Sequence, residues 1–296
     1  MALPGHPPKS ERKPIYLGLA ATVIPAMAAM SKLHIRGHEH VPEHGAFVLS
    51  PNHYSEIDPI VMAVAIWKSG RVPRFMAKAS LFEIPIVGAL LRAAGQIPVE
   101  RAGRSSHGEP MAAARTLVQD ELGVIIYPEG SLTRDPDLWP MRGKTGAVRM
   151  ALEAGVPLIP AAHWGTQHLM PRYGKGLHPF PRKHIQILFG PPVDLSEFAG
   201  RTDQAAMNAA TEKVMVAIAG LLGELRGEQP PAKRFDPAEH GVAETGRFEQ
   251  LRNEQARKRS DASGGAGAVG HRGDTDGGAD GPADAGADGG GGGGDA

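Results

Sequence analysis

The chain has 296 residues, equal numbers of basic and acidic side chains, and no cysteine. The missing cysteine excludes a disulfide framework, a thiolate metal site and a cysteine nucleophile, and it leaves an intracellular location as the default. Residues 1–230 carry 24 Lys and Arg against 20 Asp and Glu, and the remainder carries 8 against 12. The excess of +4 in the first part suits anionic substrates or lipid surfaces but is too small to indicate nucleic acid.

The N-terminal segment combines basic and apolar residues. Residues 15–30 form an uncharged, mostly apolar run that follows Lys9, Arg12 and Lys13. The run is short for a bilayer span and is interrupted by Pro25. It predicts either a buried core helix or a helix lying in the membrane interface, and we favour the interface. Residues 1–32 are therefore predicted to be a membrane-associating segment.

The stretch 52–59 places an imidazole and a carboxylate five positions apart. Residues 48–50 are strand-like, and Pro59 opens an apolar run as the first residue of a helix would. The turn between them can bring Asp58 onto one nitrogen of His53 and leave the other nitrogen to take a proton from a hydroxyl. The alternative is that Asp58 is only a helix N-cap, which accepts from backbone N–H groups.

Short apolar runs alternate with helical patterns through the middle of the chain. The predicted strands are 47–49, 74–76, 96–99, 124–127, 158–161 and 185–189. The predicted helices are 60–68, 87–94, 109–121, 144–154 and about 203–226. This alternation predicts an α/β fold with a single domain over residues 33–228, in which helices flank a largely parallel mixed sheet.

The C-terminal part has a different composition. Apolar residues thin out from about residue 230, and from Ser260 the chain is almost wholly Gly, Ala and Asp. Such a segment cannot bury enough apolar surface to offset its ordering entropy. Residues 229–296 are therefore predicted to be a disordered polar tail.

A second polar loop, residues 127–134, follows an apolar strand candidate. In open α/β sheets, ligands gather beyond the carboxyl ends of the strands. Gly130 permits close backbone approach, Glu129 supplies an acceptor, and Arg134 offers a planar fork of donors. The alternative is a surface turn with solvated charges.

A third strand exit, residues 96–104, carries two guanidinium groups. Arg101 and Arg104 are three residues apart and can clamp one phosphate from two sides. The alternative for this loop is a solvated basic turn. No metal site is predicted, because the nearest candidate is a set of histidines without carboxylate support: His34, His38, His40 and His44.

Taken in order, these segments resemble the lysophospholipid acyltransferase family, typified by bacterial 1-acylglycerol-3-phosphate acyltransferases. Four motifs of the family are matched by Asn52-His53-x4-Asp58, residues 97–104, residues 128–131 and residues 156–160. The resemblance spans roughly residues 12–226. In the third motif Ser131 replaces Thr, and Arg134 lies two places beyond the expected Arg.

The resemblance implies an O-acyltransferase that moves a fatty acyl group from acyl-CoA, or acyl carrier protein, to the free hydroxyl of 1-acylglycerol-3-phosphate, giving phosphatidic acid. His53 would act as general base and Asp58 would hold its tautomer, without an acyl-enzyme. Lys78 and Lys144 are weaker candidates for the phosphate site. The implied substrate-binding residues are Asn52, Arg101, Arg104, Glu129, Gly130, Ser131 and Arg134.

The family also implies the partners of the chain. No metal or bound cofactor is expected, because the acyl carrier is itself a substrate. The expected partners are a lysophospholipid, an acyl donor and the cytoplasmic side of the cell membrane, with the protein peripheral or shallowly inserted. One alternative keeps this phospholipid chemistry with another lyso-lipid acceptor. The other is a non-catalytic lipid-binding or membrane-docking protein, against which the His53–Asp58 pair argues.

Overall fold

The computed structural model of the chain describes residues 14–99, 116–174 and 176–243. In chain order the elements are α1 (Pro14–Met30), β1 (Ser31–Arg36), η2 (His38–His40), β2 (Phe47–Pro51), α2 (Asp58–Lys68), β3 (Met76–Lys78), α3 (Ala79–Phe82), α4 (Pro85–Ala93), β4 (Ile97–Val99), β5 (Gly123–Ile125), α6 (Gly146–Ala154), β6 (Leu158–Trp164), α7 (Thr166–Leu169), β7 (Lys183–Phe189), η3 (Ser196–Phe198) and α8 (Gln204–Arg226). The predicted α/β class is confirmed.

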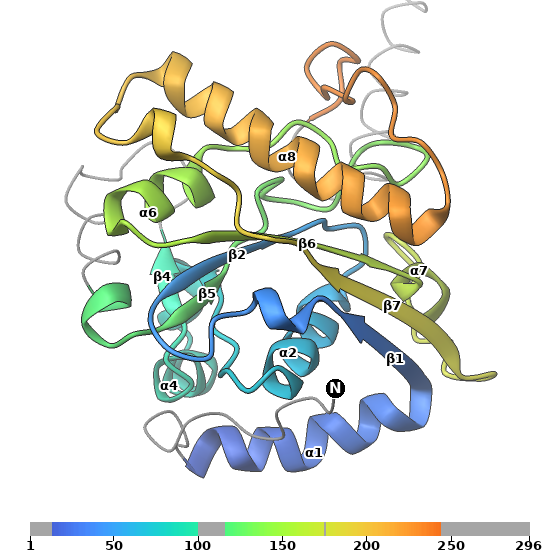
Figure 1. Cartoon of the computed structure of the whole chain (residues 1–296). Helices are drawn as coiled ribbons and strands as arrows, with labels where there is room; N and C mark the ends of the chain where they lie inside the picture. Colours follow the sequence, from blue (N-terminus) through green and yellow to red (C-terminus); the bar gives the residue numbers. More distant parts are fainter. Residues whose placement is uncertain (1–13, 100–115, 175, 244–296) are drawn as a thin grey trace, which may run out of the picture. The chain divides into compact units, whose positions relative to one another are not determined.

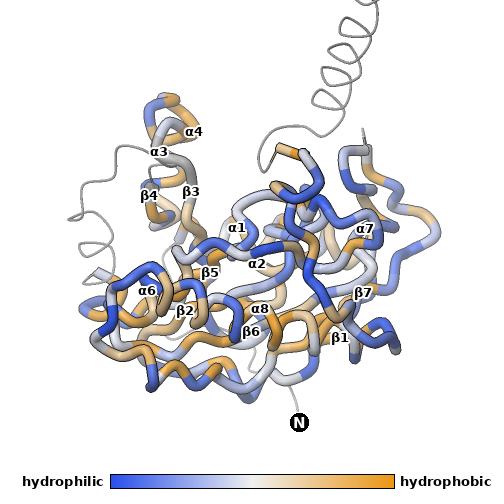
Figure 2. The backbone as a smooth tube through the Cα atoms, turned by 90° about the horizontal axis from the view of Figure 1, so that it is seen from above, coloured by the Kyte–Doolittle hydropathy of each residue, from blue (hydrophilic) through white to orange (hydrophobic). Residues whose placement is uncertain are grey.

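A five-stranded sheet with the order β1-β7-β6-β2-β5 forms the centre of the fold. Neighbouring strands run parallel except for β6 and β7, which pair antiparallel, so the sheet is mixed and largely parallel as predicted. Strands β3 and β4 form a separate parallel pair. A bridge between Phe75 and Ile125 ties this pair to the edge strand β5. Figure 2 shows α3, α4, β3 and β4 together at one side of the sheet.

The side chains of β2 explain why helices cover both faces of the sheet. Phe47 and Leu49 lie in the apolar cluster with α2, whereas Val48 lies in the cluster with α6 and α8. Successive residues of a strand point to opposite faces, so a strand that is apolar at consecutive positions needs cover on both. Figure 1 accordingly shows α6 and α8 on one side of the sheet and α2 and α1 on the other.

Helix α8 supplies much of one apolar layer. It begins where the Asp203 carboxylate accepts from the N–H of Ala206, and it ends at Gly227 in the left-handed conformation. Among the described helices it is the one long and apolar enough to cross a bilayer, but half of that stretch is buried within the protein. Its buried apolar residues include Ala210 and Val214, which pack on the core.

Helix α1 has no charged residue and is covered on one side only. Tyr16 and Met27 are buried, whereas Leu17 and Leu19 are 43% and 37% exposed. The hydroxyl of Tyr16 donates to the carbonyl of Ala94, which fixes the helix against the chain that follows α4. The predicted helix is therefore present, with an outer side that suits a membrane interface; its membrane role stays a prediction.

Several predicted boundaries need adjustment. The strand predicted at 74–76 starts only at Met76, with Phe75 forming an isolated bridge. Of the helix predicted at 109–121, residues 116–119 are helical and residues 109–115 lie outside the described chain. Residues 229–243, assigned to the polar tail, contact the domain: the N–H of Arg142 donates to the carbonyl of Phe235 at 2.9 Å. The rest of the predicted tail lies outside the described residues.

The turn after β1 allows a test of how closely the backbone of Gly37 packs against that of Phe189. Gly37 and Gly155 both have left-handed backbone angles, with φ of 72° and 64°. A Cβ at Gly37 would lie 2.0 Å from the carbonyl oxygen of Phe189, whereas one at Gly155 would meet nothing within 4 Å. Both Ala variants lose about 1–2 kcal/mol to the left-handed conformation. We expect Gly37→Ala to lose at least about 1 kcal/mol more because of the clash. Equal losses in denaturant unfolding would contradict this packing.

Candidate active site

Three strands of the sheet end at one edge and are each followed by polar residues. Strand β2 leads into His53, β5 leads through a short loop into Glu129, and β6 leads into Thr166. Because β2 is parallel to both β5 and β6, their carboxyl ends lie at the same edge. That edge is where α/β sheets place their ligand sites.

His53 and Asp58 form a hydrogen-bonded pair in the turn between β2 and α2. The Nδ1 atom of His53 lies 3.0 Å from Oδ2 of Asp58. A carboxylate only accepts hydrogen bonds, so Nδ1 carries the proton and Nε2 keeps its lone pair. The Asp58 side chain is fully buried, whereas that of His53 is 15% exposed. Within the described chain no protein group hydrogen-bonds to Nε2, so this nitrogen keeps its lone pair on a partly exposed side chain.

The carboxylate of Asp58 is held by the turn that precedes it. Its Oδ2 atom accepts from the N–H groups of Tyr54 and Ser55, both at 2.8 Å. Its Oδ1 atom accepts from the hydroxyl of Thr166 at 2.7 Å. These donors are not the first N–H groups of α2, and the helix has no side-chain cap. The alternative that Asp58 only caps the helix is therefore wrong.

A second imidazole lies behind Asp58, and the sequence analysis missed it. His163 is fully buried, with Nε2 3.0 Å from the carbonyl oxygen of Asn52 and 3.6 Å from Oδ2 of Asp58. Because a carbonyl oxygen only accepts, Nε2 of His163 carries the proton. The Asn52 amide in turn accepts from the N–H of His163 at 2.9 Å and donates to its carbonyl at 3.2 Å. Asn52 thus anchors the turn, and its contact with substrate stays a prediction.

Burial, neighbouring charges and hydrogen bonds together set the protonation of Asp58 and His163. Burial raises the pKa of Asp58, but the attraction of His163 and the hydrogen bonds from His53 and Thr166 outweigh it, so this pKa lies below its usual value. Burial lowers the pKa of His163, against the attraction of Asp58. At neutral pH the site therefore contains a charged Asp58 and a neutral His163.

Glu129 ties the loop after β5 to the backbone of His53. Its Oε1 atom accepts from the N–H of His53 at 2.9 Å, and Oε2 accepts from the N–H of Met141 at 3.0 Å. The N–H of Thr133 donates to the carbonyl of His53 at 2.7 Å, so this loop holds His53 on both sides. Burial raises the pKa of Glu129 to about 8, although the N–H donors act in the opposite direction. The acid form of Glu129 therefore dominates at neutral pH.

Tyr127 packs against the imidazole of His53. Its ring stacks on that of His53, with ring centroids 4.1 Å apart and planes 29° apart. Burial raises the pKa of Tyr127 well above its usual value, so its hydroxyl stays protonated. That hydroxyl is buried, and no described residue hydrogen-bonds to it. The aromatic residue before the Pro-Glu-Gly stretch was predicted only as the end of a strand.

The remaining predicted site residues have different surroundings. Gly130 has a φ of 68°, in the left-handed region that favours glycine. Ser131 is partly buried, and its hydroxyl lies 3.4 Å from the carbonyl oxygen of Leu132. The guanidinium of Arg134 donates to the hydroxyl of Tyr173 and is largely buried. The predicted roles of these residues in substrate binding stay predictions.

Two predicted phosphate ligands cannot be placed. Arg101 and Arg104 lie outside the described residues, so the predicted clamp stays a prediction. Lys78 lies in β3, and Lys144 lies just before α6 beside the Gly130 turn. In the described ranges, no three side chains of His, Asp or Glu are arranged to hold a metal ion.

The hydrogen bond from Thr166 to Asp58 predicts a pH-dependent loss of stability. We expect Thr166→Val to lower the free energy of unfolding at pH 7 by about 1.5–3 kcal/mol, because a buried charge loses a donor. The stability that comes from the depressed Asp58 pKa is present above its ordinary value of 3.8 and is lost as the pH falls. The loss in the variant should therefore shrink as the pH approaches and passes below 3.8.

Thr211→Val is the matched control, because the buried Thr211 hydroxyl donates to the uncharged carbonyl of Met207 at 2.7 Å. Its cost should be smaller and independent of pH. Denaturant unfolding from pH 7 to pH 3.5 measures both variants. A pH-independent cost in Thr166→Val would contradict a charged Asp58.

Comparisons with known proteins show which family this chain resembles. The family described as Acyltransferase matches residues 32–164. The 1-acyl-sn-glycerol-3-phosphate acyltransferase of Bacillus subtilis (strain 168) is 31% identical over 192 residues, which cover 63% of this chain and 86% of the relative. The chloroplastic 1-acyl-sn-glycerol-3-phosphate acyltransferase BAT2 of Brassica napus is 29% identical over 187 residues, 63% of this chain and 52% of the relative.

The chain thus spans about half the length of the plant relatives it matches. A crystal structure of the 1-acyl-sn-glycerophosphate acyltransferase PlsC from Thermotoga maritima has a TM-score of 0.49 and 22% identity, and the match covers 70% of this chain and 79% of that one. The family assignment rests on the sequences, and the predicted resemblance is confirmed. This chain belongs to the lysophospholipid acyltransferase family, that of the 1-acyl-sn-glycerol-3-phosphate acyltransferases.

Proposed function

We propose that this protein transfers a fatty acyl group from acyl-CoA or acyl carrier protein to the free hydroxyl of 1-acylglycerol-3-phosphate, giving phosphatidic acid. The single observation that carries the proposal is the His53 imidazole, with Nδ1 bonded to Asp58 and Nε2 left basic. The names of the relatives from Bacillus subtilis and Brassica napus support this choice of acceptor.

The reaction needs one base and no covalent enzyme intermediate. Nε2 of His53 takes the proton of the acceptor hydroxyl as its oxygen attacks the thioester carbonyl carbon. The tetrahedral intermediate then collapses, the C–S bond breaks, and the thiolate leaves with the proton from the imidazolium. Assistance of this kind contributes about 10²–10⁴-fold to the rate, and positioning of both substrates supplies much of the remainder.

The surroundings of Asp58 favour a positive charge on His53 and not on His163. During attack the imidazole of His53 becomes positive, and the Asp58 carboxylate 3.0 Å away stabilises that charge. His163 also approaches Asp58, but burial lowers its pKa and keeps it neutral. The negative charge of Asp58 is therefore available to His53 in the transition state, when it contributes most to the rate.

An apolar groove beside the catalytic turn supports the binding of a fatty acyl chain. It has a volume of about 320 Å³ and lies between α1, α2 and the chain around β3 and β4, with no charged residue in its lining. Pro59 and Ile60 belong to the lining and directly follow Asp58. An acyl chain in the groove would therefore have its carbonyl end near His53. Ala63 and Leu91 line opposite elements of the same groove.

Exposed apolar side chains near this groove support membrane docking. The outer side of α1 carries Leu17 and Leu19, and the segment 84–87 carries Ile86, which is 84% exposed. Amphipathic surfaces of this kind lie in the interface between headgroups and acyl chains. We therefore propose peripheral binding to the cytoplasmic side of the cell membrane, with the groove open to lipid.

The base assignment predicts the effect of removing His53. We expect His53→Ala to lower kcat/KM for transfer from labelled acyl-CoA to 1-acylglycerol-3-phosphate by at least about a hundredfold, because the general base is lost. His34→Ala is the matched control, since His34 lies on β1 and stacks on His184 away from the pair. Circular dichroism and unfolding curves check that both variants fold.

A panel of lyso-lipids decides between the alternatives. Transfer to another lyso-lipid but not to 1-acylglycerol-3-phosphate would keep the chemistry and change the acceptor. Equal transfer by wild type and His53→Ala would overturn the mechanism. Binding of lyso-lipids with no transfer would favour a non-catalytic docking protein.

The groove predicts a change in acyl-chain preference. We expect Ala63→Phe to narrow the groove and to shift the preferred donor toward shorter chains, with at least about a fivefold loss of kcat/KM for long chains, because about two buried methylenes are lost. Ala209→Phe, on an exposed position of α8, should leave the preference unchanged. The measurement is a series of acyl-CoA donors of increasing chain length. An unchanged chain-length preference in Ala63→Phe would show that the acyl chain does not bind in this groove.

A further inference from the structure

Strand β6 carries an imidazole in the interior of the protein. Its residues from Leu158 to His163 are all buried, and the others of this run bring no polar side chain. The side chain of His163 has none of its surface exposed. A buried polar side chain costs free energy unless its polar atoms are hydrogen-bonded. The partners of His163 therefore indicate what a histidine contributes at this position.

The backbone of His163 extends the pairing of β6 with β2 beyond the end of β2. The last paired residues of these two strands are Pro51 and Ala161. Beyond them the side chain of Asn52 bonds to β6 in place of a backbone: it accepts from the N–H of His163 at 2.9 Å and donates to the His163 carbonyl at 3.2 Å. The residue that precedes His53 is thus fixed to β6 by its side chain.

The imidazole of His163 holds the backbone on both sides of the proposed base. Its protonated Nε2 donates to the carbonyl of Asn52 at 3.0 Å. Its Nδ1 atom lies 3.3 Å from the hydroxyl of Tyr54, which also donates to the carbonyl of His163 at 3.0 Å. The rings of Tyr54 and His163 pack together, with centroids 4.9 Å apart. His163 therefore contacts the residue before His53 and the residue after it.

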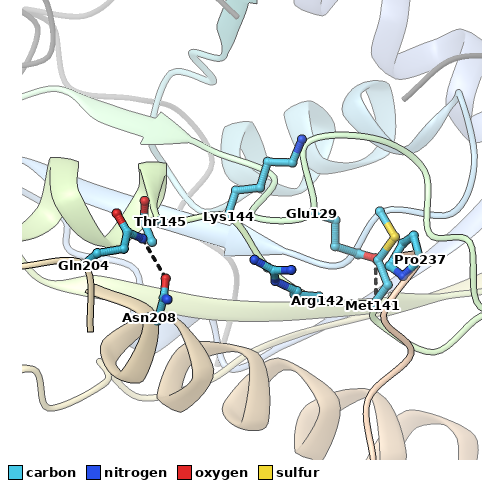
Figure 3. A pocket seen from close by; sticks show the side chains of 9 residues that line it. Glu129, Met141, Arg142, Lys144, Thr145, Gln204, Asn208 and Pro237 are labelled. Atoms are coloured by element: carbon cyan, nitrogen blue, oxygen red, sulfur yellow. Dashed lines mark hydrogen bonds between the residues drawn. The ribbon is translucent and has the colours of Figure 1, made fainter. Parts of the chain in front are cut away.

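Glu129 holds His53 itself, from the exit of another strand. Its Oε1 atom accepts from the backbone N–H of His53 at 2.9 Å. Its Oε2 atom accepts from the N–H of Met141, a hydrogen bond that Figure 3 shows. Residues 52–54 are thus held by His163 of β6 and by Glu129 after β5, and these two buried side chains share the task of fixing the turn.

We propose that His163 is a positioning residue for acyl transfer, which holds the backbone from which the His53 imidazole projects. The proposal rests on the role of His53 as base that is proposed above. His163 is fully buried, so it acts through Asn52 and Tyr54 and not by contact with a substrate. A displacement of about 1 Å in a catalytic group lowers the rate by about a hundredfold, so the bond to the carbonyl just before the base affects kcat.

Two other roles for His163 lead to different expectations. A purely structural histidine would contribute to stability and leave kcat unchanged in every variant that folds. A histidine that acted by its charge would act on Asp58, whose Oδ2 atom lies 3.6 Å from Nε2. Any uncharged replacement would then lose the effect equally, whatever hydrogen bonds it made.

Two amide variants of His163 differ in reach by one methylene group. In His163→Gln the side-chain amide can take the place of Nε2 and donate to the Asn52 carbonyl, whereas in His163→Asn it is too short. We expect His163→Asn to lower kcat by at least about tenfold with KM changed by less than about twofold, and His163→Gln to keep kcat within about threefold of wild type. Steady-state kinetics with labelled acyl-CoA measure both constants.

Two further variants keep the test decisive. Val214→Ala, in the buried cluster of α8 with α6, should lower the unfolding midpoint and leave kcat unchanged. Tyr54→Phe keeps the ring, removes the donor to the His163 carbonyl and should lower kcat by about threefold, even if His163→Asn does not fold. The proposal is overturned if a folded His163→Asn keeps its kcat, if both amide variants lose kcat equally, or if Tyr54→Phe keeps the full kcat.

A measurement that needs no reaction separates this proposal from the catalytic one. The Nδ1 proton of His53 lies between that nitrogen and the Asp58 carboxylate, and its downfield proton NMR signal is identified by its loss in His53→Ala. We expect this signal to shift in His163→Asn and to stay in place in His163→Gln. An unshifted signal in His163→Asn would overturn the positioning role. Absence of transfer by the wild type to every lyso-lipid would overturn the acyltransferase proposal instead, and the signal would still test His163.

Discussion

The burial of one carboxylate constrains the whole catalytic edge of this protein. A carboxylate in the interior costs several kcal/mol unless it is paired and hydrogen-bonded. Asp58 is fully buried and receives the N–H groups of Tyr54 and Ser55, the hydroxyl of Thr166 and the Nδ1 proton of His53. These donors come from the turn after β2 and from the first residue of α7, so satisfying the charge also fixes the imidazole. The hydrogen bonds that satisfy the buried Asp58 carboxylate thus also orient the imidazole that we propose as the base.

The second buried carboxyl group of the site, that of Glu129, avoids the cost of a buried charge by remaining protonated. Glu129 accepts from two N–H groups, yet burial still raises its pKa to about 8, so it is mainly protonated at neutral pH. His163 likewise stays neutral, because burial lowers its pKa. Three buried titratable groups therefore leave a single negative charge, on Asp58. In the proposed mechanism, the positive charge that develops on His53 is stabilised by that carboxylate 3.0 Å away.

The sequence predicted the parts of this arrangement that depend on local pattern. The segment from β2 to α2 contains local signals: a strand is followed by an imidazole, a carboxylate and Pro59. Because β2 and β5 are parallel, their carboxyl ends lie at the same edge of the sheet. The parts that were missed join segments more than a hundred residues apart, such as Thr166 and His163 with Asp58. Nothing in a buried threonine or histidine at the end of a strand signals its partner, because the contact depends on strand order and register. The hydrogen bond from Arg134 to the Tyr173 hydroxyl likewise depends on the tertiary structure.

Glu129 ties the loop after β5 to the turn that carries His53. Its carboxyl group accepts from the N–H of His53 and from that of Met141. If Glu129 were ionised, its charge would lie near that of Asp58, which contributes to the raised pKa of Glu129 after burial itself. The neutral acid avoids this repulsion and still accepts from the N–H groups. The burial that raises this pKa thus keeps a second negative charge away from the hydrogen-bonded pair of His53 and Asp58.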